Sequence, residues 1–361
     1  MEITTKKIIV VVSVIVVLVL GLTLGLVLGL RKKAKDDGDE VVIVNSYDNT
    51  AELIQKFPVN NPTTVMPGIE EKIQNRLLTG FENWNRGFAA WKAWGNILYT
   101  EDSIYNVHGT RLTLAHYQAA MNIALKQTDI KMGDFLNMVI NDNWTGIRYD
   151  FYTKVGDEYK LGMVTEFVNF KDYGGELGTR VVEGWGSTKD ESAAGMAMFQ
   201  GAEEKKVQLE QLEYMQNYKI PDTENLEEKY PVLHPTKGKG EYVEEIRSLI
   251  LKGFDSWNKG YDEWVKWIYD AYSNNAESYS LDERKRTLSE YKNEMKNLVK
   301  TQKLKKLYFD NILISENWAA LHFRYSLEEL KTGEKTFGDR MQFLKFEKSG
   351  NSLKIVSSWI Q

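Results

Sequence analysis

The chain contains no cysteine, and this absence removes a whole set of chemistries. Disulfides, thiolate nucleophiles, iron–sulfur clusters, Cys-ligated zinc and an acylated lipoprotein cysteine are all excluded. Histidine is also scarce, because the sequence holds only four: His108, His116, His234 and His322. These four lack the spacing of metal ligands. We therefore expect no metal site.

Common catalytic and nucleic-acid signatures are missing as well. The sequence has no P-loop, no G-x-S-x-G nucleophile elbow and no H-E-x-x-H zinc motif. The formal net charge is −5, and runs of three Lys or Arg occur only at 31–33, beside an apolar segment, and at 284–286. Nucleic-acid binding needs a basic surface. We expect no nucleic-acid partner and no cofactor.

What the sequence does contain is a balanced globular composition with many aromatic residues. Hydrophobic residues make up 42% and charged residues 27%, with ten Trp and nineteen Tyr among the 361 residues. This composition excludes a disordered chain. The length is enough for about two domains.

Residues 8–30 carry no charge. As a helix they would extend about 34 Å, enough to cross a hydrocarbon core of roughly 30 Å. A cleaved signal peptide is the alternative, but its apolar region would be about 7–15 residues and would end at small residues. Here the apolar run is longer and ends at Arg31-Lys32-Lys33. We predict a single transmembrane helix after a short tail, residues 1–7, with membrane lipid as its partner.

The orientation of this span is ambiguous. The basic residues on its C-terminal side outnumber Lys6 and Lys7, which favours a cytoplasmic C-terminal side. A very short N-terminal tail is instead typical of a signal anchor that exports the domains after it, and we favour extracytoplasmic domains. Gly21, Gly25 and Gly29 share one helix face and could pair two spans in a homodimer. The alternative is that glycine is simply common in membrane spans.

The sequence repeats itself internally. Residues 80–94 read GFENWNRGFAAWKAW, and residues 253–267 read GFDSWNKGYDEWVKW. Further downstream, Trp144 matches Trp318 and Trp185 matches Trp359. This order of aromatic residues predicts two homologous domains, residues 68–187 and 241–361. Residues 31–67 then read as a tether, and residues 188–240 as a partly helical linker.

Each repeat shows helical periodicity first and strand patterns afterwards. Apolar residues step by three or four from Ile69 to Trp91, and Gly87 should divide this stretch into two helices. A third helix fits residues 112–126. Strands are predicted at 135–155, 161–171 and 181–185, and in the second repeat at 309–327, 337–347 and 354–360. This order predicts an α+β fold in which helices fill the concave side of a curved antiparallel sheet.

These residues resemble the NTF2-like superfamily, particularly its SnoaL-like (polyketide cyclase-like) branch. The resemblance rests on Asn85-Arg86-Gly87, on residues 98–102 (LYTED), on His108-Gly109, and on the final hairpin that ends at Trp359. It covers both repeats. It implies two tandem cone-shaped barrels with a pocket, and often dimers that pack sheet to sheet. Asp102 matches the acidic position of the family, whereas the second repeat has Asn275 there.

Candidate catalytic groups are suggested by the pocket of this fold. By strand alternation Trp144, Arg148, Asp150 and Tyr152 share one face, and Ile147, Tyr149 and Phe151 share the other. If the polar face points inward, Asp150 and Glu166 could do acid–base chemistry beside Arg148, with His108 at the pocket mouth. The alternative is a solvent-facing or sheet-to-sheet surface, and for His108 an ordinary loop residue.

Ligand-pocket candidates are the aromatic and basic residues expected near the cone: Trp94, Tyr117, Arg148, Tyr291, His322 and Arg324. Core packing is the alternative for the aromatic ones. We interpret the chain as a membrane-anchored module that binds a small apolar ligand or another protein. The rival hypothesis is a SnoaL-like acid–base enzyme (isomerase, cyclase or dehydratase type) acting on a small apolar substrate in the first domain.

Overall fold

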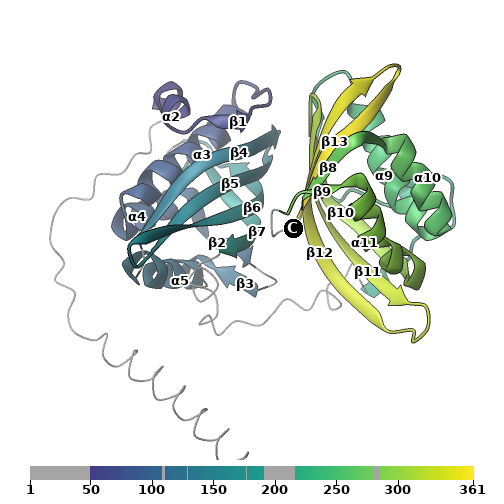
Figure 1. Cartoon of the computed structure of the whole chain (residues 1–361). Helices are drawn as coiled ribbons and strands as arrows, with labels where there is room; N and C mark the ends of the chain where they lie inside the picture. The colour runs from purple at the N-terminus through teal and green to yellow at the C-terminus, as the bar shows by residue number, and fades with distance from the viewer. Residues whose placement is uncertain (1–48, 108–109, 128, 176, 191–215, 280–283) are drawn as a thin grey trace, which may run out of the picture. The chain divides into compact units, whose positions relative to one another are not determined.

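The computed structural model describes residues 49–361 apart from 108–109, 128, 176, 191–215 and 280–283. It shows two curved sheets, each with helices against one face (Figure 1), which confirms the predicted α+β class. The predicted span at 8–30, with Gly21, Gly25 and Gly29, lies outside the described residues. None of the helices within those ranges is long and apolar enough to cross a membrane.

The first repeat builds a seven-stranded sheet in the order β1-β4-β5-β6-β7-β2-β3. Its elements are α2 (Thr50–Lys56), β1 (Val59–Asn61), α3 (Ile69–Asn85), α4 (Phe88–Leu98), β2 (Tyr99–Val107), β3 (Thr110–Thr113), α5 (Leu114–Gln127), β4 (Ile130–Asn141), β5 (Trp144–Val155), β6 (Glu158–Asp172) and β7 (Thr179–Asp190). The sheet is mostly antiparallel, but β2 pairs with β7 in parallel. Helices α3, α4 and α5 cover its concave face (Figure 1).

The second repeat builds a six-stranded sheet in the matching order β10-β11-β12-β13-β8-β9. Its elements are α8 (Leu226–Lys229), α9 (Val243–Lys259), α10 (Tyr261–Ala271), β8 (Tyr272–Tyr279), β9 (Arg286–Thr287), α11 (Leu288–Thr301), β10 (Gln302–Ser315), β11 (Trp318–Glu329), β12 (Lys335–Ser349) and β13 (Ser352–Ile360). Strand β8 again pairs in parallel with the last strand, β13. The two sheets therefore have the same connectivity.

The repeated Asn-x-Gly motif sets the break between the first two helices of each repeat. Gly87 and Gly260 precede α4 and α10 with φ of 95° and 110°, a region that only glycine enters at little cost. Just before them, Asn85 accepts a hydrogen bond from the amide of Met132 at 2.8 Å, and Asn258 accepts one from Leu304 at 3.0 Å. The motif thus turns the chain and ties the helix to the sheet.

Residues that we predicted as a tether and a linker belong in part to the folded repeats. Helix α2 and strand β1 lie within 31–67, and β1 pairs with β4 in parallel at Val59 and Phe135. In the same way Val232 bridges Phe309 in parallel. Phe57 and Tyr230 are both buried against their own core. Each repeat therefore begins about 20 residues earlier than predicted, because these segments complete the edge of the sheet. Much of the predicted, partly helical linker, residues 191–215, falls outside the described residues.

The two repeats contact each other through one face of each sheet. One buried cluster contains Val139, Trp144, Phe167, Trp185, Leu313, Trp318, Ala320, Met341 and Phe343. The Arg148 guanidinium lies 4.7 Å from the Trp359 ring centre, and the His322 ring lies 4.8 Å from that of Trp185. Arg148 matches His322 and Trp359 matches Trp185, so the contacts are reciprocal. Within the chain, part of one face of each sheet is thus covered by the other repeat.

Candidate functional site

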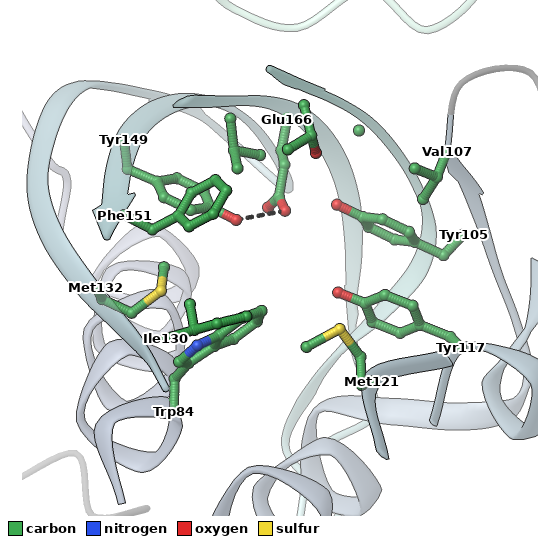
Figure 2. Close-up of a pocket in the computed structure, with 13 residues that line it drawn as sticks. Trp84, Tyr105, Val107, Tyr117, Met121, Ile130, Met132, Tyr149, Phe151 and Glu166 are labelled. Carbon is green, nitrogen blue, oxygen red and sulfur yellow. Dashed lines mark hydrogen bonds between the residues drawn. The ribbon is translucent and has the colours of Figure 1, made fainter. Parts of the chain in front are cut away.

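The first repeat encloses a small polar-centred pocket between its helices and sheet (Figure 2). The Glu166 carboxylate on β6 accepts a hydrogen bond from the Tyr149 hydroxyl at 2.8 Å. The hydroxyls of Tyr105 and Tyr117 point into the same space. The cavity volume is about 30 Å³, close to the share of a single water molecule in the liquid, which is about 30 Å³. The aromatic side chains leave little room.

Glu166 is surrounded by protein, and the surface it retains faces the pocket. Burial raises the pKa of its carboxyl, and hydrogen bonds from Tyr105 and Tyr149 lower it without cancelling that effect. Burial also holds the pKa of Tyr105 and Tyr149 well above 10, so both phenols stay neutral donors. A carboxyl group with a raised pKa is suited to give or take a proton near neutral pH.

The second repeat has a much larger cavity in the equivalent place. Its volume is about 270 Å³. Apolar and aromatic side chains form most of its wall: Ile250, Phe254, Trp257, Trp264, Trp267, Tyr272, Tyr291, Met295, Leu298, Leu304, Phe323, Tyr325, Leu327, Leu344, Ile355 and Ile360. Arg340 and Gln342 supply polar groups. The indole N–H groups of Trp257 and Trp267 donate to backbone carbonyls at 3.1 Å, which fixes those two rings.

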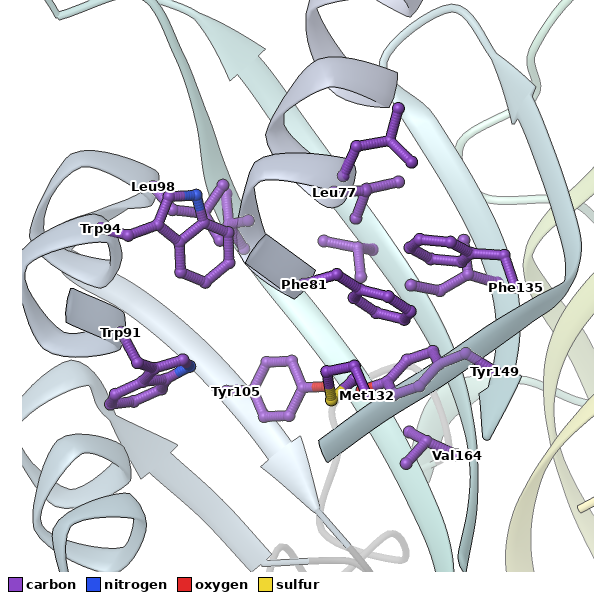
Figure 3. Close-up of a cluster of buried hydrophobic side chains, with 14 of the residues drawn as sticks. Leu77, Phe81, Trp91, Trp94, Leu98, Tyr105, Met132, Phe135, Tyr149 and Val164 are labelled. Atoms are coloured by element: carbon purple, nitrogen blue, oxygen red, sulfur yellow. The ribbon is translucent and has the colours of Figure 1, made fainter. Parts of the chain in front are cut away.

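One side chain explains much of the difference in volume. Tyr105 pairs with Gly184 across β2 and β7, whereas Ser278 pairs with Ser358 across β8 and β13. The Tyr105 ring stacks on Tyr117 at 4.8 Å between ring centres and occupies the space beside Gly184. Serine at the equivalent position leaves that volume empty. Figure 3 shows Tyr105 among the large side chains that pack the first repeat.

The strand register also shows which residues of the two cavities occupy equivalent positions. Glu166 lies opposite Ile147, and Gln342 lies opposite Leu321, so Gln342 takes the place of Glu166. Likewise Val164 lies opposite Tyr149, and Arg340 lies opposite Phe323. A negative group and an apolar group in the first repeat are therefore replaced by a neutral amide and a cation in the second.

Two of the predicted catalytic residues do not meet. Tyr149 and Phe151 line the pocket, so their neighbour Asp150 points to the other face of β5, where it accepts from the Asp134 amide at 2.6 Å. Arg148 shares that face and is buried against the second repeat. The hypothesis that the polar face points inward is therefore wrong, because the opposite and more hydrophobic face of β5 lines the pocket. His108 lies outside the described residues.

His322 and Arg324, predicted as pocket residues, also lie on the face between the repeats. The Nδ1 atom of His322 is 3.0 Å from Asp310 and its Nε2 is 3.7 Å from Asp339. Arg324 Nε is 3.2 Å from Asp310. Burial alone would lower the pKa of His322, but the charge of Asp310 together with hydrogen bonding to Asp310 and Asp339 outweighs burial and raises that pKa. These groups form a buried ion cluster outside the ligand cavity.

The aromatic residues predicted near the pocket lie inside their own repeats. Tyr117 lines the small pocket, and Tyr291 lines the large cavity at the equivalent position. Burial raises the pKa of Tyr291 to about 12, so its hydroxyl stays neutral. Trp94 is buried and borders a second space in the first repeat of about 50 Å³. Its indole donates to Thr79 at 3.2 Å, which makes it chiefly a core residue.

Sequence reasoning missed Tyr105, Tyr149 and Arg340. The available signal was the alternation on β5, where the face of Ile147, Tyr149 and Phe151 is the more hydrophobic and should have been placed inward.

The sequence also contained a signal for the early start of each repeat. Thr50, Leu53, Lys56, Pro58, Val59, Pro62 and Thr63 recur as Thr223, Leu226, Lys229, Pro231, Val232, Pro235 and Thr236.

No protein-family model matches the chain, and no curated protein matches it. Among solved structures it is similar to an NTF2-like superfamily protein from Salmonella enterica, with 17% identity, a TM-score of 0.28, and 32% of this chain and 87% of that chain covered. A ketosteroid isomerase-like protein from Erwinia carotovora matches at 12% identity and a TM-score of 0.27, with 33% of this chain and 95% of that chain covered. A Mesorhizobium loti protein with a SnoaL-like polyketide cyclase designation matches at 12% identity and a TM-score of 0.25, with 32% of this chain and 97% of that chain covered.

Proposed function

We propose that the chain is a small-molecule-binding protein of two tandem NTF2/SnoaL-like domains, and that the second repeat holds the ligand. The cavity of about 270 Å³ carries this proposal. Small-molecule sites are concave, mostly apolar and equipped with a few polar groups, and this volume approaches the usual range of about 300–1,000 Å³. The described residues that line it include no carboxylic acid and no histidine, which favours binding over acid–base catalysis there.

The proposal is tested by filling the cavity. Leu298 on α11 lines it, and Leu298→Trp should occupy part of the volume. Lys296 is exposed on the same helix, so Lys296→Trp is the matched control. With the full-length chain, isothermal titration of 2-naphthalenemethanol should show one site in wild type and Lys296→Trp, and a loss of at least tenfold in Leu298→Trp. Equal binding by all three proteins would place the probe elsewhere and reject the proposal.

A second function is favoured by Glu166, whose raised pKa within a pocket suits an acid–base enzyme in the first repeat. Because the pocket volume is only about 30 Å³, the test uses acetone, a very small ketone, and follows deuterium incorporation at its α-carbons by NMR. Glu166→Gln should abolish any incorporation above the buffer rate. Asp150→Asn, which changes a carboxyl outside the pocket, should leave it unchanged. Equal rates for wild type and Glu166→Gln would remove this function.

We also propose that residues 8–30 anchor the chain in a membrane, with the two repeats on the extracytoplasmic side. The length of the apolar run supports the anchor, and the very short tail before it, residues 1–7, supports the export of the repeats. Alkaline carbonate extraction of cells should leave the full-length chain in the pellet and release a variant that lacks 8–30. Protease added to intact cells should then cleave the repeats. Gly25→Leu should weaken any dimer formed through Gly21, Gly25 and Gly29.

A further inference from the structure

We infer that the ligand of the second repeat is a flat apolar carboxylate whose anion pairs with Arg340. This inference rests on the proposed binding function and adds the chemical class of the ligand. Among the described residues that line the cavity, Arg340 is the only charged one. The cavity therefore presents one positive charge at its edge and apolar surface elsewhere.

The Arg340 guanidinium is placed to receive an anion. Arg340, Gln342 and Leu344 alternate on the cavity side of β12. Within the described part of the chain, no carboxylate lies within ion-pair distance of Arg340, and its Nη1 donates to the Asp339 carbonyl at 2.7 Å. Arginine has five N–H donors in a planar fork that matches a carboxylate. Most of those donors remain for a ligand.

A comparison of the two repeats also indicates that the ligand of the second cavity is an anion. Val164 stands where the second repeat has Arg340, and Glu166 stands where it has Gln342. The charged residue that lines the first pocket is negative, and the charged residue that lines the second is positive. Both substitutions lower the energy of an anion in the second cavity.

The shape of the wall indicates the rest of the ligand. Trp257, Trp264 and Tyr291 are aromatic walls of the cavity. The Arg340 guanidinium lies 5.8 Å from the ring centre of Tyr325, so the charged end is held beside an aromatic ring. A planar apolar body can lie against such rings while its carboxylate reaches the edge. An aryl carboxylate satisfies both requirements, whereas an ammonium ligand would meet a like charge.

The test compares three probes of one shape in the full-length chain at pH 7.5: 2-naphthoate, 2-naphthalenemethanol and 2-naphthylmethylammonium. Isothermal titration should show naphthoate binding at least tenfold more tightly than the alcohol, and the ammonium most weakly. Added salt should reduce the preference, because an exposed ion pair is screened. Arg340→Gln should remove the preference, so that acid and alcohol bind equally.

The matched control is Lys335→Gln, which removes one positive charge from the same strand outside the cavity wall and should keep the tenfold preference. Equal binding of acid and alcohol by the wild-type protein would overturn the carboxylate inference while leaving the binding function intact. A preference that persists in Arg340→Gln would also overturn it. If neither probe binds, the binding function itself fails, and the inference fails with it.

Discussion

Gly253 lies directly under the indole of Trp267: a Cβ on Gly253 would stand 2.5 Å from Cζ2 of that ring. The first repeat has the same relationship, since a Cβ on Gly80 would stand 2.7 Å from Cζ2 of Trp94. In each repeat the absence of a side chain lets the second helix lie close to the first. The repeated Gly and Trp are therefore one packing unit.

Gly253→Ala should destabilise the protein by about 1–3 kcal/mol, because the added methyl group overpacks the contact with Trp267. It should also weaken probe binding, since Trp267 lines the cavity. Urea denaturation and titration measure the two effects. Gly95→Ala is the control: it lies within α4, its nearest neighbour would be 3.9 Å away, and helix propensity should make it neutral or stabilising. Equal effects at both glycines would contradict this account.

Asn258→Ala should cost about 1–3 kcal/mol, because it leaves the amide of Leu304 without its acceptor. Asn258→Asp retains an acceptor oxygen and should recover most of the loss. Hydrogen exchange adds a local measurement: the Leu304 amide should exchange faster in the Ala variant than in the Asp variant. If the Asn258→Asp and Asn258→Ala variants are equally unstable, the lost hydrogen bond is not the source of the destabilisation.

Tyr105→Ser should open the pocket of the first repeat, because it introduces the residue found at the equivalent position, Ser278. Losing a buried aromatic ring should cost about 3–5 kcal/mol. The number of bound naphthalenemethanol molecules should rise from one to two per chain. Tyr173→Ser removes an exposed tyrosine and should change neither quantity. An unchanged stoichiometry in Tyr105→Ser would show that Tyr105 does not close this pocket.

The ion cluster of His322 predicts a pH window for stability. The pKa of His322 is raised above 6.5, so its contribution is complete below 6.5 and is lost as the pH rises through the folded value. Burial would raise the pKa of Asp310 and Asp339, but His322 outweighs it and lowers both below 3.8. Their contribution is therefore complete above 3.8 and is lost at lower pH. Arg324, on the same strand as His322, also faces Asp310 and keeps its charge throughout.

His322→Gln should therefore destabilise the protein most between about pH 4 and 6.5, by about 3–5 kcal/mol, since it removes one partner of a buried pair. The difference from wild type should shrink above the folded pKa of His322. Denaturation curves at several pH values measure it. His116→Gln changes an exposed histidine on α5 and should give a flat difference. A pH-independent loss in His322→Gln would indicate a packing effect instead.

The carboxyl of Glu166 should make the folded protein less stable as the pH rises. Burial raises its pKa above 4.5, so the folded state holds the carboxyl proton more tightly than the unfolded chain does. Stability therefore falls as the pH rises from about 4.5 through the pKa of the folded state. Glu166→Gln cannot ionise, so it should be more stable than wild type at pH 8 and similar at pH 4. Thermal unfolding at both values tests this. A lower Tm at pH 8 would mean that the carboxylate contributes more through Tyr149 than burial costs.

The helices were predictable because their signals are local. The apolar stripe from Ile69 to Trp91 and the glycine at position 87 predict α3 and α4 within one or two residues. The final hairpin, on which part of the family resemblance rests, is likewise present, with Lys348-Ser349-Gly350-Asn351 where β12 meets β13. The parallel pairing of β2 with β7 was not predictable in this way, since its partners are about 80 residues apart and share no turn.

The sequence by itself determined the repeated framework, the α+β order and the absence of thiol chemistry, because composition and periodicity record them directly. Alternation on β5 defines two faces, and the more hydrophobic one lines the pocket; tertiary structure decided that part of the other face is buried against the second repeat. It also decided which repeat keeps a cavity. The register places Tyr105 beside Gly184 in the first repeat, where its ring fills the pocket. In the second repeat it places Ser278 beside Ser358, and serine has no ring to fill the cavity.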